Sequence, residues 1–257
     1  MKKFINLFFI LALVAVGFTS CEEKEETPNG IPGMGDTPGE LEIEKPFVVP
    51  EGITITGLEG LENVPTDVSQ TQLKSSQHSF SRRGCGGSFF RHNFRAWITV
   101  KVIFQNSSSG KRCITLPSGL VFEVNKPGYQ HGITVAPVKV CIEGNSATTV
   151  SLYLMCINRG KDGSDTNVKY SIKGVTGAKK ILRLINRLKN KRVNWQNYIN
   201  SLPSTHLKST NADEIEKYRE VADAIQNDIW TLTNDGVDLS KEQIEYIESI
   251  PMLVDVQ

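Results

Sequence analysis

Hydrophobic and polar residues alternate along much of the chain between residues 53 and 172, which is typical of strands with one buried face. The clearest case is residues 97–104, where Ile98, Val100, Val102 and Phe104 share one face. Similar short runs predict strands near residues 53–56, 113–116, 120–124, 133–142 and 149–157. Turn residues such as Pro117 and Gly119 separate them. Short strands with turns between them predict an antiparallel β-sandwich domain over residues 51–173.

After Gly174 the hydrophobic period changes to that of a helix. Apolar residues recur every three or four positions in each of several segments. The predicted helices are residues 181–188, a short piece that ends at Pro203, residues 211–232, and residues from Ser240 to Pro251. Ser240 and Gln243 have the spacing of a capping box for the last of these. The sequence therefore predicts an α+β fold, with a helical segment (residues 174–257) packed on the sandwich.

The first 20 residues have the pattern of a secretory signal peptide. Lys2 and Lys3 precede an uncharged run over residues 4–18 that is too short to span a bilayer comfortably. Residues 18–21, Phe-Thr-Ser-Cys, resemble a bacterial lipobox, which implies that Cys21 is lipidated and becomes the new N-terminus. The acidic run over residues 22–26 resembles the export signal of surface lipoproteins of Bacteroidota. These resemblances imply a protein anchored by lipid in the outer membrane and displayed at the cell surface.

Residues 21–50 are rich in proline and glycine and contain few large apolar residues before Phe47. Such a segment buries too little surface to order itself. We therefore expect a flexible acidic linker that holds the domain away from the membrane.

Four cysteines remain besides Cys21 in an oxidising compartment, so two disulfides are the default. Alternation places Cys113 and Cys141 on the polar faces of their strands, whereas Cys156 belongs to an apolar face. Residues on opposite faces of a sheet cannot be bridged without rearranging the backbone. A Cys113–Cys141 disulfide is therefore favoured, and Cys156 is left to pair with Cys85, to stay a buried thiol or to take another role.

Two short segments carry a family resemblance. Residues 154–158, Leu-Met-Cys-Ile-Asn, close the strand region, and residues 225–230, Ile-Gln-Asn-Asp-Ile-Trp, lie in the longest predicted helix. Together they resemble the thioester domains of bacterial surface adhesins, which also join a β-rich part to a helical part. The resemblance implies that Cys156 and Gln226 condense to a thioester that captures amines on a partner. It also implies that Ile229 and Trp230 shield that bond from water. The sequence departs from the family pattern at Met155 and Asp228. Two alternatives therefore stay open: a related domain that keeps the architecture and has lost the bond, or an unrelated fold in which Cys156 is a core or disulfide-bonded residue and Gln226 lies on the helix surface.

Charge and motifs point away from several other functions. With 29 Lys+Arg against 28 Asp+Glu, the chain has no strongly basic domain for nucleic acid. Arginines and phenylalanines do interleave over residues 82–95, but an exported protein rarely meets single-stranded nucleic acid. Residues 162–167 offer oxygens but lack EF-hand spacing, and the four histidines are scattered, so neither a metal nor another cofactor is expected.

Three functions follow from these observations. The first is an envelope protein without enzymatic activity that binds a host protein, an envelope protein or a glycan. The second is a covalent adhesin that uses a Cys156–Gln226 thioester. The third is a hydrolase that acts on an extracellular polymer, for which the chain shows no motif.

Overall fold

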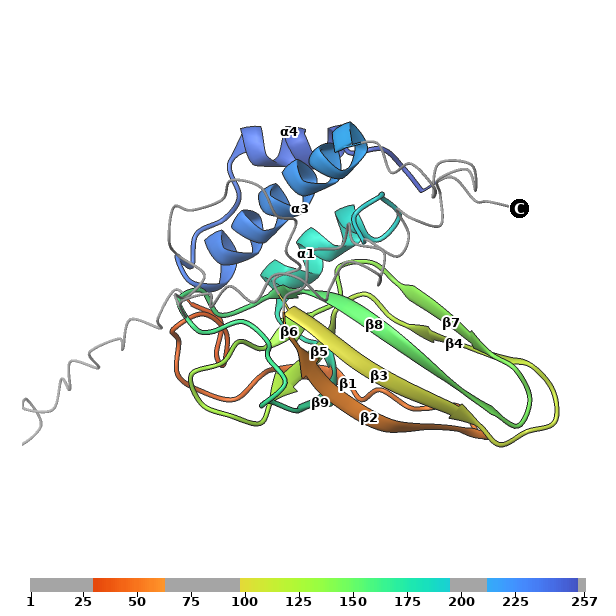
Figure 1. The fold of residues 1–257 in the computed structure, drawn as a ribbon. Helices are drawn as coiled ribbons and strands as arrows, with labels where there is room; N and C mark the ends of the chain where they lie inside the picture. Colours follow the sequence, from red (N-terminus) through yellow and green to blue (C-terminus); the bar gives the residue numbers. More distant parts are fainter. Residues whose placement is uncertain (1–29, 63–97, 195–211, 254–257) are drawn as a thin grey trace, which may run out of the picture.

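The computed structural model describes residues 30–62, 98–194 and 212–253. The described chain forms antiparallel sheets with helices α1, α3 and α4 on one side (Figure 1). The strands are β1 (Ile43–Lys45), β2 (Ile53–Leu61), β3 (Ile98–Asn106), β4 (Arg112–Leu116), β5 (Leu120–Val124), β6 (Gly132–Ile133), β7 (Val138–Ile142), β8 (Ser146–Cys156) and β9 (Tyr170–Thr176). The helices are α1 (Lys179–Leu188), α3 (Ala212–Thr233) and α4 (Lys241–Ser249).

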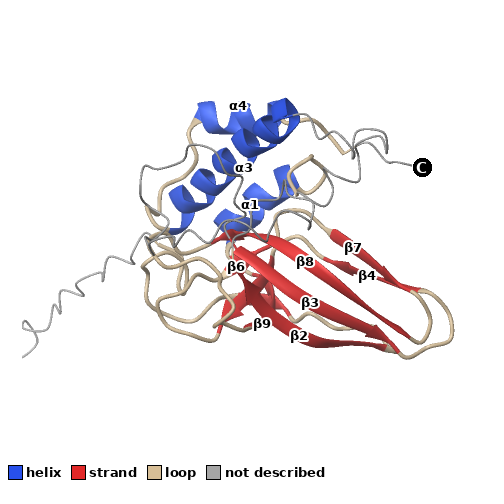
Figure 2. Ribbon diagram, viewed as in Figure 1, coloured by secondary structure: helices blue, strands red, loops and turns tan. Residues whose placement is uncertain are grey.

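Seven of the strands form one curled sheet in the order β1-β9-β5-β6-β8-β3-β2, and β4 and β7 form a separate pair. The curl brings the end of β2 back to the start of β9, because the Gly60 N–H donates to the Val168 carbonyl and Glu59 bridges to Lys169. The α+β class with antiparallel strands is thus confirmed. The expected β-sandwich is not confirmed, because one sheet is curled and the second has only two strands (Figure 2).

Two hydrophobic clusters explain the layering. One lies inside the curl, where β3, β5 and β8 face β4 and β7. The other lies between the outer face of the sheet and the three helices. Along β8, Leu152 and Leu154 face the inner cluster, whereas Met155 faces the helices. A strand buried on both sides in this way can carry functional side chains into either cluster.

The structure changes two of the expected boundaries. β1 pairs with β9, so the sheet begins before residue 51 and ends after residue 173. The strand expected over residues 133–142 is divided into β6 and β7, because Pro137 lacks an N–H for a ladder. The helix expected to end at Pro203 and the start of the helix expected from residue 211 lie outside the described residues. The capping box of Ser240 and Gln243 is confirmed at the start of α4.

The expected linker is partly folded. Residues 30–37, called here the N-terminal segment, pack against the helical side of the sheet, and Met34 is 0% exposed. Ile31 joins the same cluster. Composition did not reveal this contact, because only two apolar side chains anchor the segment. The part of the expected linker before residue 30 lies outside the described residues.

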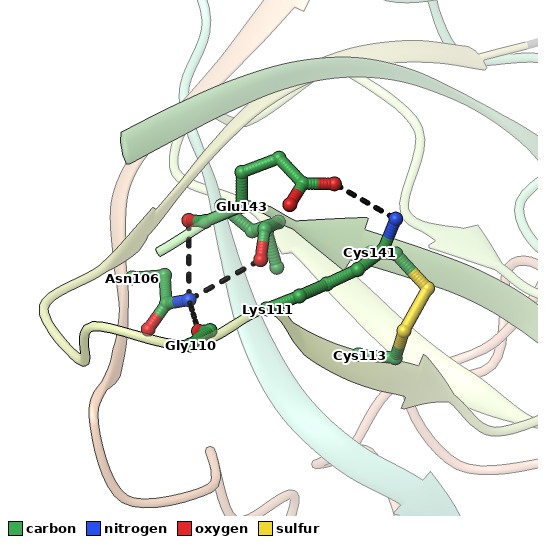
Figure 3. The surroundings of a disulfide bond; sticks show 7 residues. Asn106, Gly110, Lys111, Cys113, Cys141 and Glu143 are labelled. Carbon is green, nitrogen blue, oxygen red and sulfur yellow. Dashed lines mark hydrogen bonds and ion pairs between the residues drawn. A yellow bond between two sulfur atoms is a disulfide. The ribbon is translucent and has the colours of Figure 1, made fainter. Parts of the chain in front are cut away.

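Asn106 organises the end of the sheet opposite the helices, beside the Cys113–Cys141 disulfide (Figure 3). Its amide nitrogen donates to the carbonyl oxygens of Gly110, Ile142 and Glu143 at 2.8, 3.2 and 3.1 Å. Its side-chain oxygen accepts from the N–H of Ser108. One side chain therefore joins the β3–β4 turn to the end of β7.

We expect Asn106→Ala to lower the free energy of unfolding by about 2–3 kcal/mol, because it removes three hydrogen bonds from one side chain, including the buried bond to the Ile142 carbonyl. Chemical denaturation measures the change. Asn227→Ala is the control, because Asn227 is exposed on α3, and it should change stability by no more than about 0.5 kcal/mol. Equal stability of Asn106→Ala and the wild type would contradict the bridging role of Asn106.

Candidate functional site

Cys156 is the last residue of β8, and its side chain belongs to the inner cluster together with Leu152 and Leu154. The residue is 0% exposed and carries a thiol rather than a disulfide. Alternation along the strand therefore places this thiol in the core, as the sequence predicts. Ile157, the next residue, faces the helices.

Gln226 on α3 meets the backbone of Cys156 in a two-point contact. The Cys156 N–H donates to Oε1 of Gln226 at 2.8 Å, and Nε2 of Gln226 donates to the Cys156 carbonyl at 2.8 Å. Gln226 is 0% exposed, so both bonds lie in a dry environment. The carboxamide thus pairs with Cys156 as a peptide group pairs in a β-ladder.

The position of Cys156 in the sheet explains why this partner is needed. The described pairing of β3 with β8 ends at Ile98 and Leu154. Backbone groups two residues apart on a strand point to the same side. The N–H and carbonyl of Cys156 therefore point to the same side of β8 as those of Leu154, but beyond the last described pair with β3. Buried backbone groups require partners. α3 supplies both partners with a single side chain.

The residues around Gln226 keep this contact dry. Trp230, one turn further along α3, is almost fully buried and joins the inner cluster with Cys156. Ile225 and Ile229 join the cluster on the helical side. Ile229 and Trp230 are thus both buried on the helix that carries Gln226. This arrangement leaves the thiol and the carboxamide among apolar side chains.

Asp228, a departure from the family pattern, is directed away from Cys156. Its Oδ1 accepts from Nε2 of Gln243 on α4 at 2.7 Å, and the residue is only 4% exposed. Burial raises the pKa of Asp228 to about 6, against a lowering contribution from the bond to Gln243. Asp228 therefore links α3 to α4.

Because its pKa is raised, Asp228 lowers the free energy of unfolding at neutral pH. Its pKa in the folded protein is about 6, against 3.8 for an ordinary aspartate, so the folded state binds the proton more tightly. Stability from this group is full below about pH 4 and falls as the pH rises toward 6. Asp228→Asn keeps an acceptor for Gln243 and removes the buried charge.

We expect Asp228→Asn to raise the free energy of unfolding by about 1–3 kcal/mol at pH 7 and to have little effect at pH 4. Denaturation at both pH values measures this. Asp238→Asn is the control, since Asp238 is exposed and pairs only at the surface, and we expect a change below about 1 kcal/mol. A gain for Asp228→Asn that is the same at both pH values would refute the charge explanation.

Two titratable side chains lie near the end of β8. Burial raises the pKa of Tyr170, and the neighbouring Cys156 raises that pKa further. Burial and the nearby Lys161 lower the pKa of His131, whose Nδ1 accepts from the N–H of Val124. Both groups are therefore neutral at neutral pH. Tyr170 is therefore a neutral neighbour of Cys156.

Asn158 is a site residue whose role the sequence did not reveal. It is buried, its Oδ1 accepts from the N–H of His131, and its Nδ2 donates to the Gly35 carbonyl at 3.0 Å. The side chain therefore joins β8 to the segment before β6 and to the N-terminal segment. Its place two residues after Cys156 was the only signal in the sequence.

The other predicted site residues have separate places. Cys113 and Cys141 face each other across β4 and β7 and form the expected disulfide, in a different sheet from the one that contains Cys156. Cys21 and Cys85 lie outside the described residues, as do the arginines and phenylalanines of residues 82–95. In the loop over residues 162–167, both carboxylate oxygens of Asp165 already accept protein hydrogen bonds, from Tyr129 and from the N–H of Asn167.

No family model, curated protein or solved structure matches this chain. Within the described ranges, no helix is long and apolar enough to cross a membrane. The same residues contain no group of three or more His, Cys, Asp or Glu side chains placed to hold a metal ion. The functional proposal therefore rests on the Cys156–Gln226 contact and not on a similarity to a known protein.

Proposed function

We propose that this protein captures a partner covalently through a thioester between Cys156 and Gln226. The observation that carries the proposal is the two-point contact, in which both polar ends of the Gln226 carboxamide lie 2.8 Å from the Cys156 backbone. The two hydrogen bonds hold the carboxamide beside the Cα of Cys156, between its N–H and its carbonyl. The sulfur of Cys156 is only two bonds from that Cα. Rotation about the Cα–Cβ bond therefore moves the thiol relative to a carboxamide that is already fixed.

Thioester formation requires no outside reagent. The sulfur attacks Cδ of Gln226, the carbon–nitrogen bond breaks, and the nitrogen leaves as ammonia with the thiol proton. The Cys156 N–H, which already donates to Oε1, stabilises the negative charge that develops on that oxygen during the attack. The fixed geometry also replaces a bimolecular encounter with an intramolecular one.

Capture then reverses the roles at the same carbon. A primary amine on the partner attacks Cδ, the carbon–sulfur bond breaks, and Cys156 regains a thiol. The product is an amide between Gln226 and the partner. Each molecule reacts once, so the protein is a binding protein rather than an enzyme.

The N-terminal resemblances supply the cellular setting of this proposal. Lipid on Cys21 would anchor the domain in the outer membrane, with the acidic run at residues 22–26 directing it to the cell surface. A protein displayed there meets host and envelope proteins, which carry lysine amines. Replacement of Cys21 by alanine should release the protein from the membrane fraction, and an unchanged membrane fraction would contradict the lipid anchor.

Labelling with a biotin-bearing primary amine tests the capture chemistry. The mature chain, produced without its lipidated Cys21 as residues 22–257, should incorporate one label, mapped to Gln226 by peptide mass spectrometry. Cys156→Ala is the matched control, because the two hydrogen bonds to Gln226 use the backbone of residue 156 and remain available. Labelling of Gln226 in both proteins, or in neither, would refute the thioester. The remaining proposal would then be a lipid-anchored protein that binds a protein or glycan without a covalent bond.

A further inference from the structure

We propose that the N-terminal segment, residues 30–37, is a clamp that controls access to Cys156 and Gln226. The inference concerns regulation of the site and rests on the proposed function. Its basis is that the segment touches both elements that carry the reacting side chains. These elements are the end of β8, which carries Cys156, and α3, which carries Gln226 about two turns before the helix end that the segment touches.

The contacts to the β8 side fall on the two residues that follow Cys156. The N–H of Gly35 donates to the Ile157 carbonyl at 2.7 Å. Nδ2 of Asn158 donates to the carbonyls of Gly33 and Gly35 at 3.4 and 3.0 Å. The backbone just after Cys156 is therefore held by the N-terminal segment.

The contacts to the α3 side fall at the end of the helix. Nδ2 of Asn234 donates to Oδ2 of Asp36 at 3.1 Å. Gly35 passes so close to the Thr233 carbonyl that a Cβ at this position would collide with it, and its φ of +59° also favours glycine. Met34 is 0% exposed and lies in the cluster that contains Ile157 and Ile229. The segment thus fills the junction between strand and helix.

The position of this segment in the chain gives the clamp its regulatory meaning. It comes directly after the part of the linker that leads back to Cys21, so a pull on the membrane anchor reaches residues 30–37 before the sheet or the helices. Local opening of such a segment needs less free energy than global unfolding, because it breaks few contacts. Opening frees Ile157 and Asn158 and loosens the hold on the two elements beside Cys156 and Gln226.

A pair of glycine variants tests the clamp in the mature chain. Gly35→Ala introduces the collision with Thr233, whereas Gly128→Ala has a comparable positive φ, +86°, and no atom within 4 Å of its Cβ. Asp36→Ala, which removes only the bond to Asn234, is a milder second variant that preserves folding. The readouts are incorporation of methylamine at Gln226 and alkylation of Cys156 by iodoacetamide, both followed by peptide mass spectrometry.

We expect the reaction rate to rise by about tenfold or more in Gly35→Ala, by less in Asp36→Ala, and hardly at all in Gly128→Ala. Molecules with a thioester report through methylamine, and molecules with a thiol report through iodoacetamide. Failure of the proposed function therefore leaves the clamp testable on Cys156. Equal rates in the Asp36→Ala, Gly128→Ala and wild-type proteins, with Gly35→Ala no faster than its own loss of stability explains, would overturn the clamp.

Discussion

Replacing Gln226 by alanine is expected to lower the free energy of unfolding by about 3–5 kcal/mol. In molecules that have not formed the thioester, the substitution removes two buried hydrogen bonds at once and leaves the Cys156 N–H and carbonyl without this partner. It also opens a cavity between α3 and β8, since Gln226 is 0% exposed. Urea denaturation measures the loss. Gln105→Ala is the control, because Gln105 is an exposed glutamine on β3, and it should have an effect below about 0.5 kcal/mol.

Cys156→Ala separates the hydrogen bonds of Gln226 from a covalent bond. Without a thioester, the variant loses only a buried sulfur and should cost about 1 kcal/mol, because the backbone contacts to Gln226 remain. With a thioester, it also removes a cross-link between residues 70 positions apart, for which chain entropy predicts a loss of about 4 kcal/mol. A loss in Gln226→Ala that is no larger than in Gln105→Ala would contradict the structural role of the contact itself.

Removal of the Cys113–Cys141 disulfide is expected to cost about 3–4 kcal/mol. The bond joins residues 28 positions apart and links the β4–β7 pair, which contributes many side chains to the inner cluster. Cys113 is exposed and Cys141 is half-buried, so replacement of both by serine removes little packing. The loss therefore reports mainly the added freedom of the unfolded chain.

Reductant provides the control for this prediction. It should lower the melting temperature of the wild type to that of the double serine variant, and leave the variant unchanged. A wild type that keeps its melting temperature after verified reduction of the bond would contradict the expected stabilisation.

The local pattern of the sequence predicted much of the sheet and one half of the site. Alternation placed Cys156 on the apolar face of β8 and Cys113 and Cys141 on the polar faces of their strands, because side chains alternate on any strand. The capping box of Ser240 and Gln243 could also be predicted from the sequence, since its two hydrogen bonds are local. These features depend on residues that are close in sequence.

Contacts between distant parts of the chain could not be predicted from such local patterns. The bond from Gln226 to the backbone of Cys156 joins helix to strand, and alternation describes side chains rather than the backbone groups at a strand's edge. The N-terminal segment has the composition of a linker, yet two buried side chains and a few backbone bonds hold it in place. The sequence marked Asp228 only as a departure from the family pattern, and its bond to Gln243 on α4 is again a contact between separate helices.

The intact mass of the mature chain, measured without reductant and before any amine is added, tests the thioester most directly. We predict a mass that is lower by one ammonia than the sequence with its disulfides requires, and that rises by one methylamine after treatment. The intact mass of Cys156→Ala, measured in the same way, should show no such deficit. A wild-type mass that disulfides alone explain, with Gln226 unmodified after methylamine, would contradict covalent capture.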